Sequence, residues 1–131
     1  SIREDKELLL KDLCGRLHYG VNVQTKASGG ITTNGILWSI DYSDAGTFIY
    51  HSGSSLGYDI NEDIIKPYLR PMSSMTEEEK KEHFGRTMTI DIVQTSKEVI
   101  DWLNKHHFDY RGLIEKGLAI KVTEENNPYK E

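Results

Sequence analysis

Histidines and carboxylates are the residues of this chain that first suggest catalytic or metal-binding chemistry. Five histidines occur, and two of them, His106 and His107, are adjacent and lie close in sequence to Asp101 and Asp109. Histidine titrates nearest to neutral pH, so either one beside a carboxylate could act as an acid or base. Adjacent helical residues point about 100° apart, whereas helical metal pairs are spaced i, i+4, so a shared metal ion is not expected. A small enzyme that combines His106 or His107 with Asp101 or Asp109 stays open as an alternative.

Two nucleophile candidates carry less support. Residues 53–57 read Gly-Ser-Ser-Leu-Gly, a formal match to the G-x-S-x-G pattern of serine hydrolases. That pattern needs a helix directly after it, and residues 58–61 do not predict one, so we interpret residues 51–61 as a Gly- and Ser-rich loop. The single Cys14 cannot form an internal disulfide, and it excludes zinc sites with two or more cysteines. Its place four residues after Leu10 predicts a small buried apolar group.

The segment 96–122 holds the densest group of aromatic and charged side chains. Val99, Leu103 and the histidine pair recur at helical spacing after Ser96, a suitable N-cap, which predicts an amphipathic helix. A second short helix is expected from about Tyr110 to a left-handed cap at Gly117. Such a cluster either packs a core or presents a binding surface. The hypothetical binding residues within it are Trp102, His106, His107, Tyr110 and Arg111.

The overall composition describes one ordinary globular domain. The chain has 131 residues, of which 37% are hydrophobic and 28% are charged, and this length can bury a core without metals or disulfides. No apolar run approaches the roughly 20 residues that span a bilayer, and no signal-peptide pattern opens the chain, so we expect a cytoplasmic protein without membrane contact. No phosphate-binding loop, dinucleotide fingerprint or calcium loop is present, so no cofactor is expected.

The charge of the chain disfavours nucleic acid as a partner. The formal net charge is −5 at pH 7 and the pI is about 5.5, so the protein repels a phosphate backbone on average. A nucleic-acid accessory protein stays open as a second alternative. It would require four cations on one face, namely Arg70, Arg86, Lys105 and Arg111.

The elements that must position these residues follow from hydrophobic periodicity. Leucines along residues 3–17 predict an opening amphipathic helix that closes near Gly20. Alternation predicts strands at 19–25 and 31–42, with a bulge or bend at Gly35, and a third strand in which Phe48 and Tyr50 share a face. Short turns at 27–30 and 43–46 join these strands into an antiparallel meander.

The next part of the chain predicts a connector, a surface helix and one more strand. Residues 63–71 contain Pro67 and Pro71, which favour an extended connector across the core, anchored by Ile64, Ile65, Tyr68 and Leu69. Thr76 and Glu79 form a capping box that opens a highly charged surface helix. Residues 88–92 alternate as a fourth strand before segment 96–122, which we call the C-terminal hub.

Together these elements predict a single α+β domain over residues 1–123: an N-terminal helix, three to five antiparallel strands in an open or barrel-like sheet, and a C-terminal helical hub. Residues 124–131 are expected to form a loose tail. Seven tyrosines and two tryptophans exceed what one small core readily hides, so some rings are expected to be available to a partner. We therefore expect a non-catalytic protein- or peptide-interaction module of unspecified oligomeric state.

Three segments carry a resemblance to a known group of sequences. They are DLCGRLHYGV at 12–21, IKPYLRPMSSMTEEEKKE at 65–82 and DWLNKHHFDYRGLIEKGLA at 101–119. These segments resemble an uncharacterised family of short proteins from gut bacteria of the Bacteroides type and their mobile elements, in which Pro tends to stand where this chain has His18. The resemblance implies a small accessory protein and assigns no reaction, substrate or catalytic residue.

Overall fold

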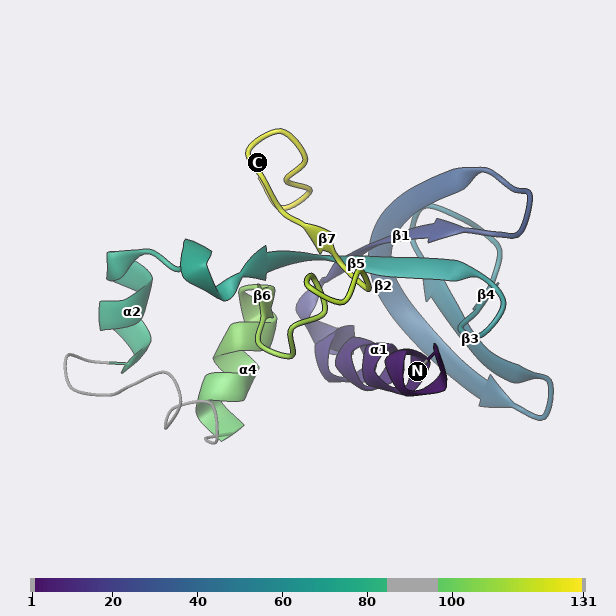
Figure 1. The fold of residues 1–131 in the computed structure, drawn as a ribbon, viewed down its shortest axis with the longest axis horizontal. Coiled ribbons are helices and arrows are strands. Elements are labelled where there is room, and N and C mark those ends of the chain that lie inside the picture. Colours follow the sequence, from purple (N-terminus) through teal and green to yellow (C-terminus); the bar gives the residue numbers. More distant parts are fainter. Residues whose placement is uncertain (1, 85–96, 131) are drawn as a thin grey trace.

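The α+β class is confirmed by the computed structural model, which describes residues 2–84 and 97–130 (Figure 1). An N-terminal helix packs on a mostly antiparallel sheet, and shorter helices lie towards the end of the molecule opposite β3. The elements in chain order are α1 Ile2–Arg16, η1 Leu17–Tyr19, β1 Asn22–Lys26, β2 Thr32–Ser43, β3 Gly46–His51, β4 Tyr58–Asp59, β5 Ile64–Pro71, η2 Met72–Ser74, α2 Glu77–Phe84, α4 Lys97–Lys105, β6 Phe108–Asp109 and β7 Ile120–Lys121.

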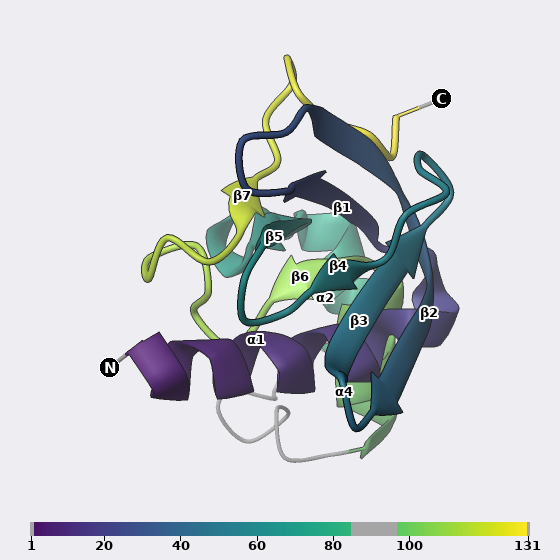
Figure 2. The same cartoon turned by 90° about the vertical axis from the view of Figure 1, so that its right-hand side faces the viewer.

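The described part of the sheet has seven strands in the order β4-β3-β2-β1-β5-β6, and β7 pairs with β5 beside this path. This number exceeds the three to five strands that the sequence predicts. The difference arises because β4, β6 and β7 have only two residues each, which is too short for an alternation of apolar and polar residues to be detected. The strand β2 serves two neighbours in turn: residues 32–36 pair with β1 and residues 37–43 pair with β3. Figure 2 turns β2 and β3 towards the viewer.

The expected connector at 63–71 is the central strand β5. Its first half pairs antiparallel with β1, and its second half pairs parallel with β7 and β6. Pro67 lies at the last position of the β1 ladder, opposite Val23, so its missing N–H falls where one ladder ends and the next begins. Ile65 and Leu69 are buried anchors as expected, whereas Ile64 is 53% exposed.

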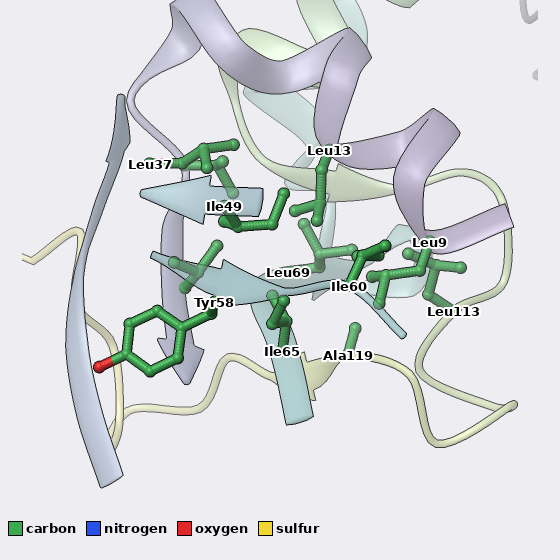
Figure 3. Close-up of a cluster of buried hydrophobic side chains, with 12 residues drawn as sticks. Leu9, Leu13, Leu37, Ile49, Tyr58, Ile60, Ile65, Leu69, Leu113 and Ala119 are labelled. Atoms are coloured by element: carbon green, nitrogen blue, oxygen red, sulfur yellow. The ribbon is translucent and has the colours of Figure 1, made fainter. Parts of the chain in front are cut away.

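Helix α1 covers the inner face of the sheet and forms the main core with it (Figure 3). Leu9 and Leu13 of the helix are almost fully buried, as are Val21 and Val23. Gly20 has φ 71° and ends the 3₁₀ turn that follows the helix, as its sequence position predicts. Cys14 is exposed, which corrects the expectation of a buried thiol, because the buried face of α1 instead runs through Leu9, Asp12, Leu13 and Arg16.

A second, smaller core supports the C-terminal hub. It contains Met75, Val99, Trp102, Leu103 and Phe108, so helix α4 places its apolar stripe as the sequence predicts. The prediction of a short helix from Tyr110 is wrong, because the residues that follow form turns. The left-handed glycine at its expected end is confirmed, since Gly117 has φ 74° and the amide of Leu118 donates to the carbonyl of Leu113 over 2.9 Å.

The capping box is confirmed at the start of α2. The amide of Glu79 donates to Thr76 Oγ1 over 3.1 Å, and the amide of Thr76 donates to Glu79 Oε1 over 3.0 Å. The expected strand at 88–92, the N-cap Ser96 and the cation Arg86 lie outside the described residues. None of the described helices is long and apolar enough to cross a membrane.

The segment after Thr123, expected to be a loose tail, is anchored at Tyr129. Its hydroxyl donates to the carbonyl of Tyr68 over 2.7 Å and accepts the amide of Asn22 over 2.9 Å. Burial raises the pKa of this phenol well above its usual range. A contact between strands β1 and β5 and a residue near the chain end is one that local sequence patterns do not reveal.

Candidate functional site

One of the five hypothetical binding residues of the hub, Trp102, belongs to its buried core. Trp102 is only 6% exposed. Its ring stacks on Phe108, with centroids 5.7 Å apart and planes 17° apart, and the ring of His106 lies 4.4 Å away on centroids. A side chain so covered supplies packing rather than contact area for a partner. Tyr110, Arg111, His106 and His107 are each partly exposed.

The two adjacent histidines are held by different neighbours. His107 has φ 64°, in the left-handed region, and its ring stacks on Tyr129. Burial, aided by the positive charge of Arg16, lowers the pKa of His107 to about 4. It is therefore neutral at pH 7. Its Nδ1 is buried and has no hydrogen-bond partner among the described residues.

The carboxylate of Asp109 is committed to the backbone. One oxygen accepts the amide of Leu113 over 2.9 Å and the other accepts the amide of Ile114 over 3.0 Å. A hollow of about 480 Å³ lies beside Asp109 and Tyr110, and neither His106 nor His107 lines it. Neither histidine therefore shares this hollow with Asp109, which is one of the two carboxylates, Asp101 and Asp109, that the enzyme alternative combines with them.

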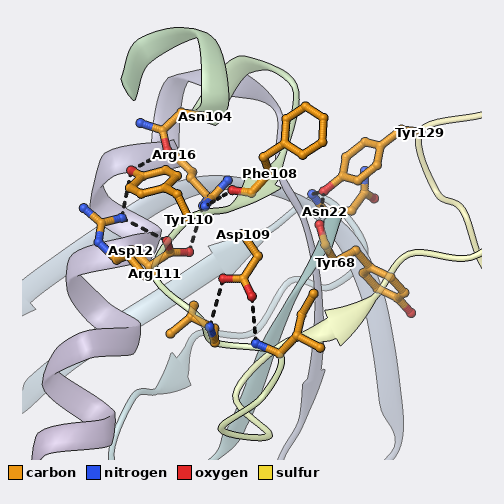
Figure 4. Close-up of polar contacts among 12 residues, drawn as sticks. Asp12, Arg16, Asn22, Tyr68, Asn104, Phe108, Asp109, Tyr110, Arg111 and Tyr129 are labelled. Atoms are coloured by element: carbon orange, nitrogen blue, oxygen red, sulfur yellow. Dashed lines mark hydrogen bonds and ion pairs between the residues drawn. The ribbon is translucent and has the colours of Figure 1, made fainter. Parts of the chain in front are cut away.

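Two arginines and one aspartate form a buried clamp that sequence reasoning missed (Figure 4). Asp12 and Arg16, both fully buried, are joined over 2.8 Å, and Arg111 Nη1 reaches the other oxygen of Asp12 over 2.9 Å. Arg16 Nη2 also donates to the carbonyl of Phe108 over 2.6 Å. These contacts connect helix α1 to Phe108 and Arg111, at the start of the turns that follow β6. The one available signal was the i, i+4 spacing of Asp12 and Arg16 in the opening helix.

Tyr110 extends this clamp rather than facing outwards on its own. Its hydroxyl accepts a hydrogen bond from Arg111 Nη1 over 2.9 Å and donates to Asn104 Oδ1 over 2.8 Å. The guanidinium groups of Arg16 and Arg111 lie over its ring, 5.2 Å and 4.7 Å from the centroid. Tyr110 and Arg111 therefore perform a structural task whether or not they also bind a partner.

Two of the four cations required by the nucleic-acid alternative, Arg70 and Arg111, are engaged in ion pairs. Arg70 forms two hydrogen bonds with Glu79, of 2.9 Å and 2.7 Å, and lies over the ring of Phe108. These bonds hold the pKa of Glu79 at about 2. Arg111 is paired with Asp12, as described above. Lys105 is exposed, and Arg86 lies outside the described residues.

A buried histidine, His51, lies just before the Gly-Ser-Ser-Leu-Gly segment, and its ring does not contact a serine of that segment. His51 is fully buried; its Nδ1 accepts the amide of Gly53 over 3.0 Å, so Nε2 carries the proton and donates to Thr25 Oγ1 over 2.7 Å. Burial lowers the pKa of His51. Both ring nitrogens are thus occupied, and none remains to activate Ser55.

Steric contacts explain the glycines of this segment. A side chain at Gly53 would overlap the carbonyl of Asn34, and one at Gly57 would come within 2.8 Å of the Tyr50 ring. Gly35 faces the same close approach from β2, since a Cβ there would overlap the amide of Gly53. The bulge expected at Gly35 instead falls between Leu37 and Ser39.

The exposed ring of Trp38 lies on the outer side of β2 and β3. Trp38 is 63% exposed and Ile36 is 47% exposed, while Leu37 between them is buried. The bulge places both Trp38 and Ser39 opposite Tyr50, and the Trp38 and Tyr50 rings are tilted by 48° with centroids 6.0 Å apart. We call the outward side chains Ile36, Trp38, Phe48 and Tyr50 the Trp38 face.

The bulge interrupts the predicted alternation of the second strand, so Ile36 and Trp38 face outwards, whereas Ile40 and Tyr42 lie on the opposite side. Ile36, Trp38 and Tyr42 are all exposed. The Trp38 face was missed as a site because the sequence places large apolar residues at every second position without marking which side of the sheet is covered.

Among residues 2–84 and 97–130, no three His, Cys, Asp or Glu side chains are grouped so that they could hold a metal ion. Comparisons with protein-family models, with curated proteins and with solved structures found no match to this chain.

Proposed function

We propose that this protein is a non-catalytic interaction module that binds a protein partner through the Trp38 face. The observation that carries the proposal is the exposure of Trp38, which is 63% exposed at the bulge of strand β2. Tryptophan combines a large apolar area with little conformational entropy and is enriched among the residues that dominate protein interfaces.

The surroundings of Trp38 support the same proposal. The neighbouring Ile36 adds apolar area, and the tilted ring of Tyr50 supports Trp38 from the next strand. Tyr50 itself lies tightly over the backbone of Gly57. The Trp38 face is therefore built on paired strands that are already ordered, so binding a partner loses little conformational entropy there. The hub residues, by contrast, are engaged in packing and in the buried clamp.

The test is capture of a partner from a lysate of the native host, its identification by mass spectrometry, and measurement of binding between the two purified proteins by calorimetry. Trp38→Ala should weaken binding at least about tenfold, the loss typical of an interface hot spot. Circular dichroism should show that the variant is folded, because its side chain lies outside both cores.

Tyr42→Ala is the matched control for this experiment. Tyr42 is 88% exposed on the same strand, but it pairs with Thr47 and therefore points to the opposite side of the sheet from the Trp38 face. Its replacement should change the affinity less than about twofold. Equal affinities for wild type and folded Trp38→Ala would contradict the proposal.

A further inference from the structure

The net negative charge of the chain arises in the segment that builds the Trp38 face, because this segment has no basic residues to balance its carboxylates. Residues 27–65 contain five carboxylates, Asp41, Asp44, Asp59, Glu62 and Asp63, and no Lys or Arg. The rest of the chain contains 16 basic and 16 acidic residues, so the formal net charge of −5 belongs entirely to this segment. The segment forms β2, β3, β4 and their loops.

Two of these carboxylates flank the Trp38 face in register. Phe48 pairs with Asp41 on one side and with Asp59 on the other, so all three side chains point outwards together. Asp41 is exposed and accepts a hydrogen bond from Ser39 over 3.2 Å, which leaves its second oxygen available. Within the described part of the chain, no carboxylate of residues 27–65 forms an ion pair with a Lys or Arg side chain.

We propose that the partner of the Trp38 face is a basic protein segment, with a Lys or Arg side chain lying across Trp38 and Tyr50 and its charge directed to Asp41. This inference rests on the proposed function and adds the chemistry of the partner. The faces of aromatic rings attract cations, and the nearby carboxylates attract the same groups over a longer distance. The electrostatic field of residues 27–65 therefore favours a positively charged partner, and the rings of Trp38 and Tyr50 supply the contact area.

The same charges argue against a second copy of this chain as the occupant. A symmetric dimer through the Trp38 face would place Asp41 and Asp59 of one copy close to the same residues of the other. Like charges brought together in this way are destabilising. An acidic segment or a nucleic acid would meet the same repulsion.

The first test follows the two tryptophan indole N–H signals by NMR, since the chain contains only Trp38 and Trp102. The probe is a short end-blocked peptide of alternating arginine and serine, and its matched control carries glutamate in place of arginine. The arginine peptide should move the Trp38 signal and leave that of the buried Trp102 in place. If the Trp38 signal does not move, or if both peptides move it equally, the inference is overturned.

The second test compares two variants that change the net charge by the same amount. Asp41→Asn should weaken binding of the arginine peptide about threefold, and raising the salt from about 0.05 M to about 0.5 M should weaken it further. Glu78→Gln lies on α2, at the opposite end of the molecule from β3 (Figure 1), and should have less than half that effect. Equal effects of the two variants would overturn a contact at Asp41.

The two proposals fail in different ways. A lysate partner that is lost with Trp38→Ala, but whose binding is insensitive to salt and to Asp41→Asn, would leave the interaction module standing and overturn its basic partner. A partner that binds Trp38→Ala as well as wild type would overturn both.

Discussion

The ring of Tyr129 lies almost parallel to the ring of His107, with centroids 3.7 Å apart and planes 8° apart. The contact joins a residue near the C-terminal end to the left-handed turn that follows helix α4. Through its hydroxyl, Tyr129 also bridges the backbone of β1 and β5. One side chain thus ties three parts of the chain together.

Tyr129→Phe should lower the free energy of unfolding by about 1 to 2 kcal/mol. The variant keeps the ring stack but removes the hydroxyl, leaving the amide of Asn22 and one lone pair of the Tyr68 carbonyl without this partner. Urea unfolding followed by circular dichroism measures the loss. Tyr42→Phe, at an exposed position, should change stability by less than about 0.5 kcal/mol. Equal stabilities of wild type and Tyr129→Phe would show that the tail contact contributes nothing.

His107 should make the protein less stable as the pH falls from about 6.5 to about 4. Its pKa in the folded protein is about 4, below the ordinary value of 6.5, because burial and Arg16 disfavour the charged ring. Between these two values the unfolded chain binds more protons, so acid favours unfolding. Urea unfolding at a series of pH values, compared with His107→Gln, measures this effect. The variant should show a shallower decline, and an unchanged decline would contradict the assignment.

Asp12→Asn should lower the free energy of unfolding by roughly 3 kcal/mol. The substitution removes the negative charge that Arg16 and Arg111 share in a buried site, and it leaves two cations close together. Thermal unfolding measures the loss. Glu7→Gln is the control on the same helix, because it breaks only the exposed pair with Arg3 and should change stability by less than about 0.5 kcal/mol. Similar losses in the two variants would argue against the clamp.

The two tryptophans should separate stability from binding. Trp102→Ala should destabilise the protein by about 3 to 5 kcal/mol, since its ring is buried against Phe108 and Leu103. Trp38→Ala should change the free energy of unfolding by less than about 0.5 kcal/mol. Urea unfolding of both variants provides the comparison. A large loss of stability from Trp38→Ala would mean that its exposed ring is part of the fold.

Local patterns were sufficient to predict the elements that carry strong periodicity or a specific cap. The opening helix, the first three strands, the capping box at Thr76 and the stripe of α4 all follow from neighbours within a few residues. The strand β5 could be recognised only as extended, because its partners are far away in sequence. The two-residue strands β4, β6 and β7 exist through pairing alone.

The candidate site was harder to predict because burial is decided by packing between distant segments. Arg16 and Asp12 occupy positions that a polar helix face would supply, yet both are fully buried, where Arg111 pairs with Asp12 and the Phe108 carbonyl accepts a hydrogen bond from Arg16. Trp38 alternates like a core residue and is exposed. The residue types thus indicated which side chains could bind, and tertiary structure determined which of them remain accessible.

The pairing of β5 also predicts an order of folding. The ladders β1–β2 and β2–β3 join segments that are neighbours in sequence, so closing the short loops between them loses little conformational entropy. The parallel pairs of β5 with β6 and β7 join positions such as Tyr68 and Ile120, and they require long stretches of chain to be closed first. We expect the hairpins β1–β2 and β2–β3, which include Trp38, to form early, and we expect β6 and β7 to pair with β5 last.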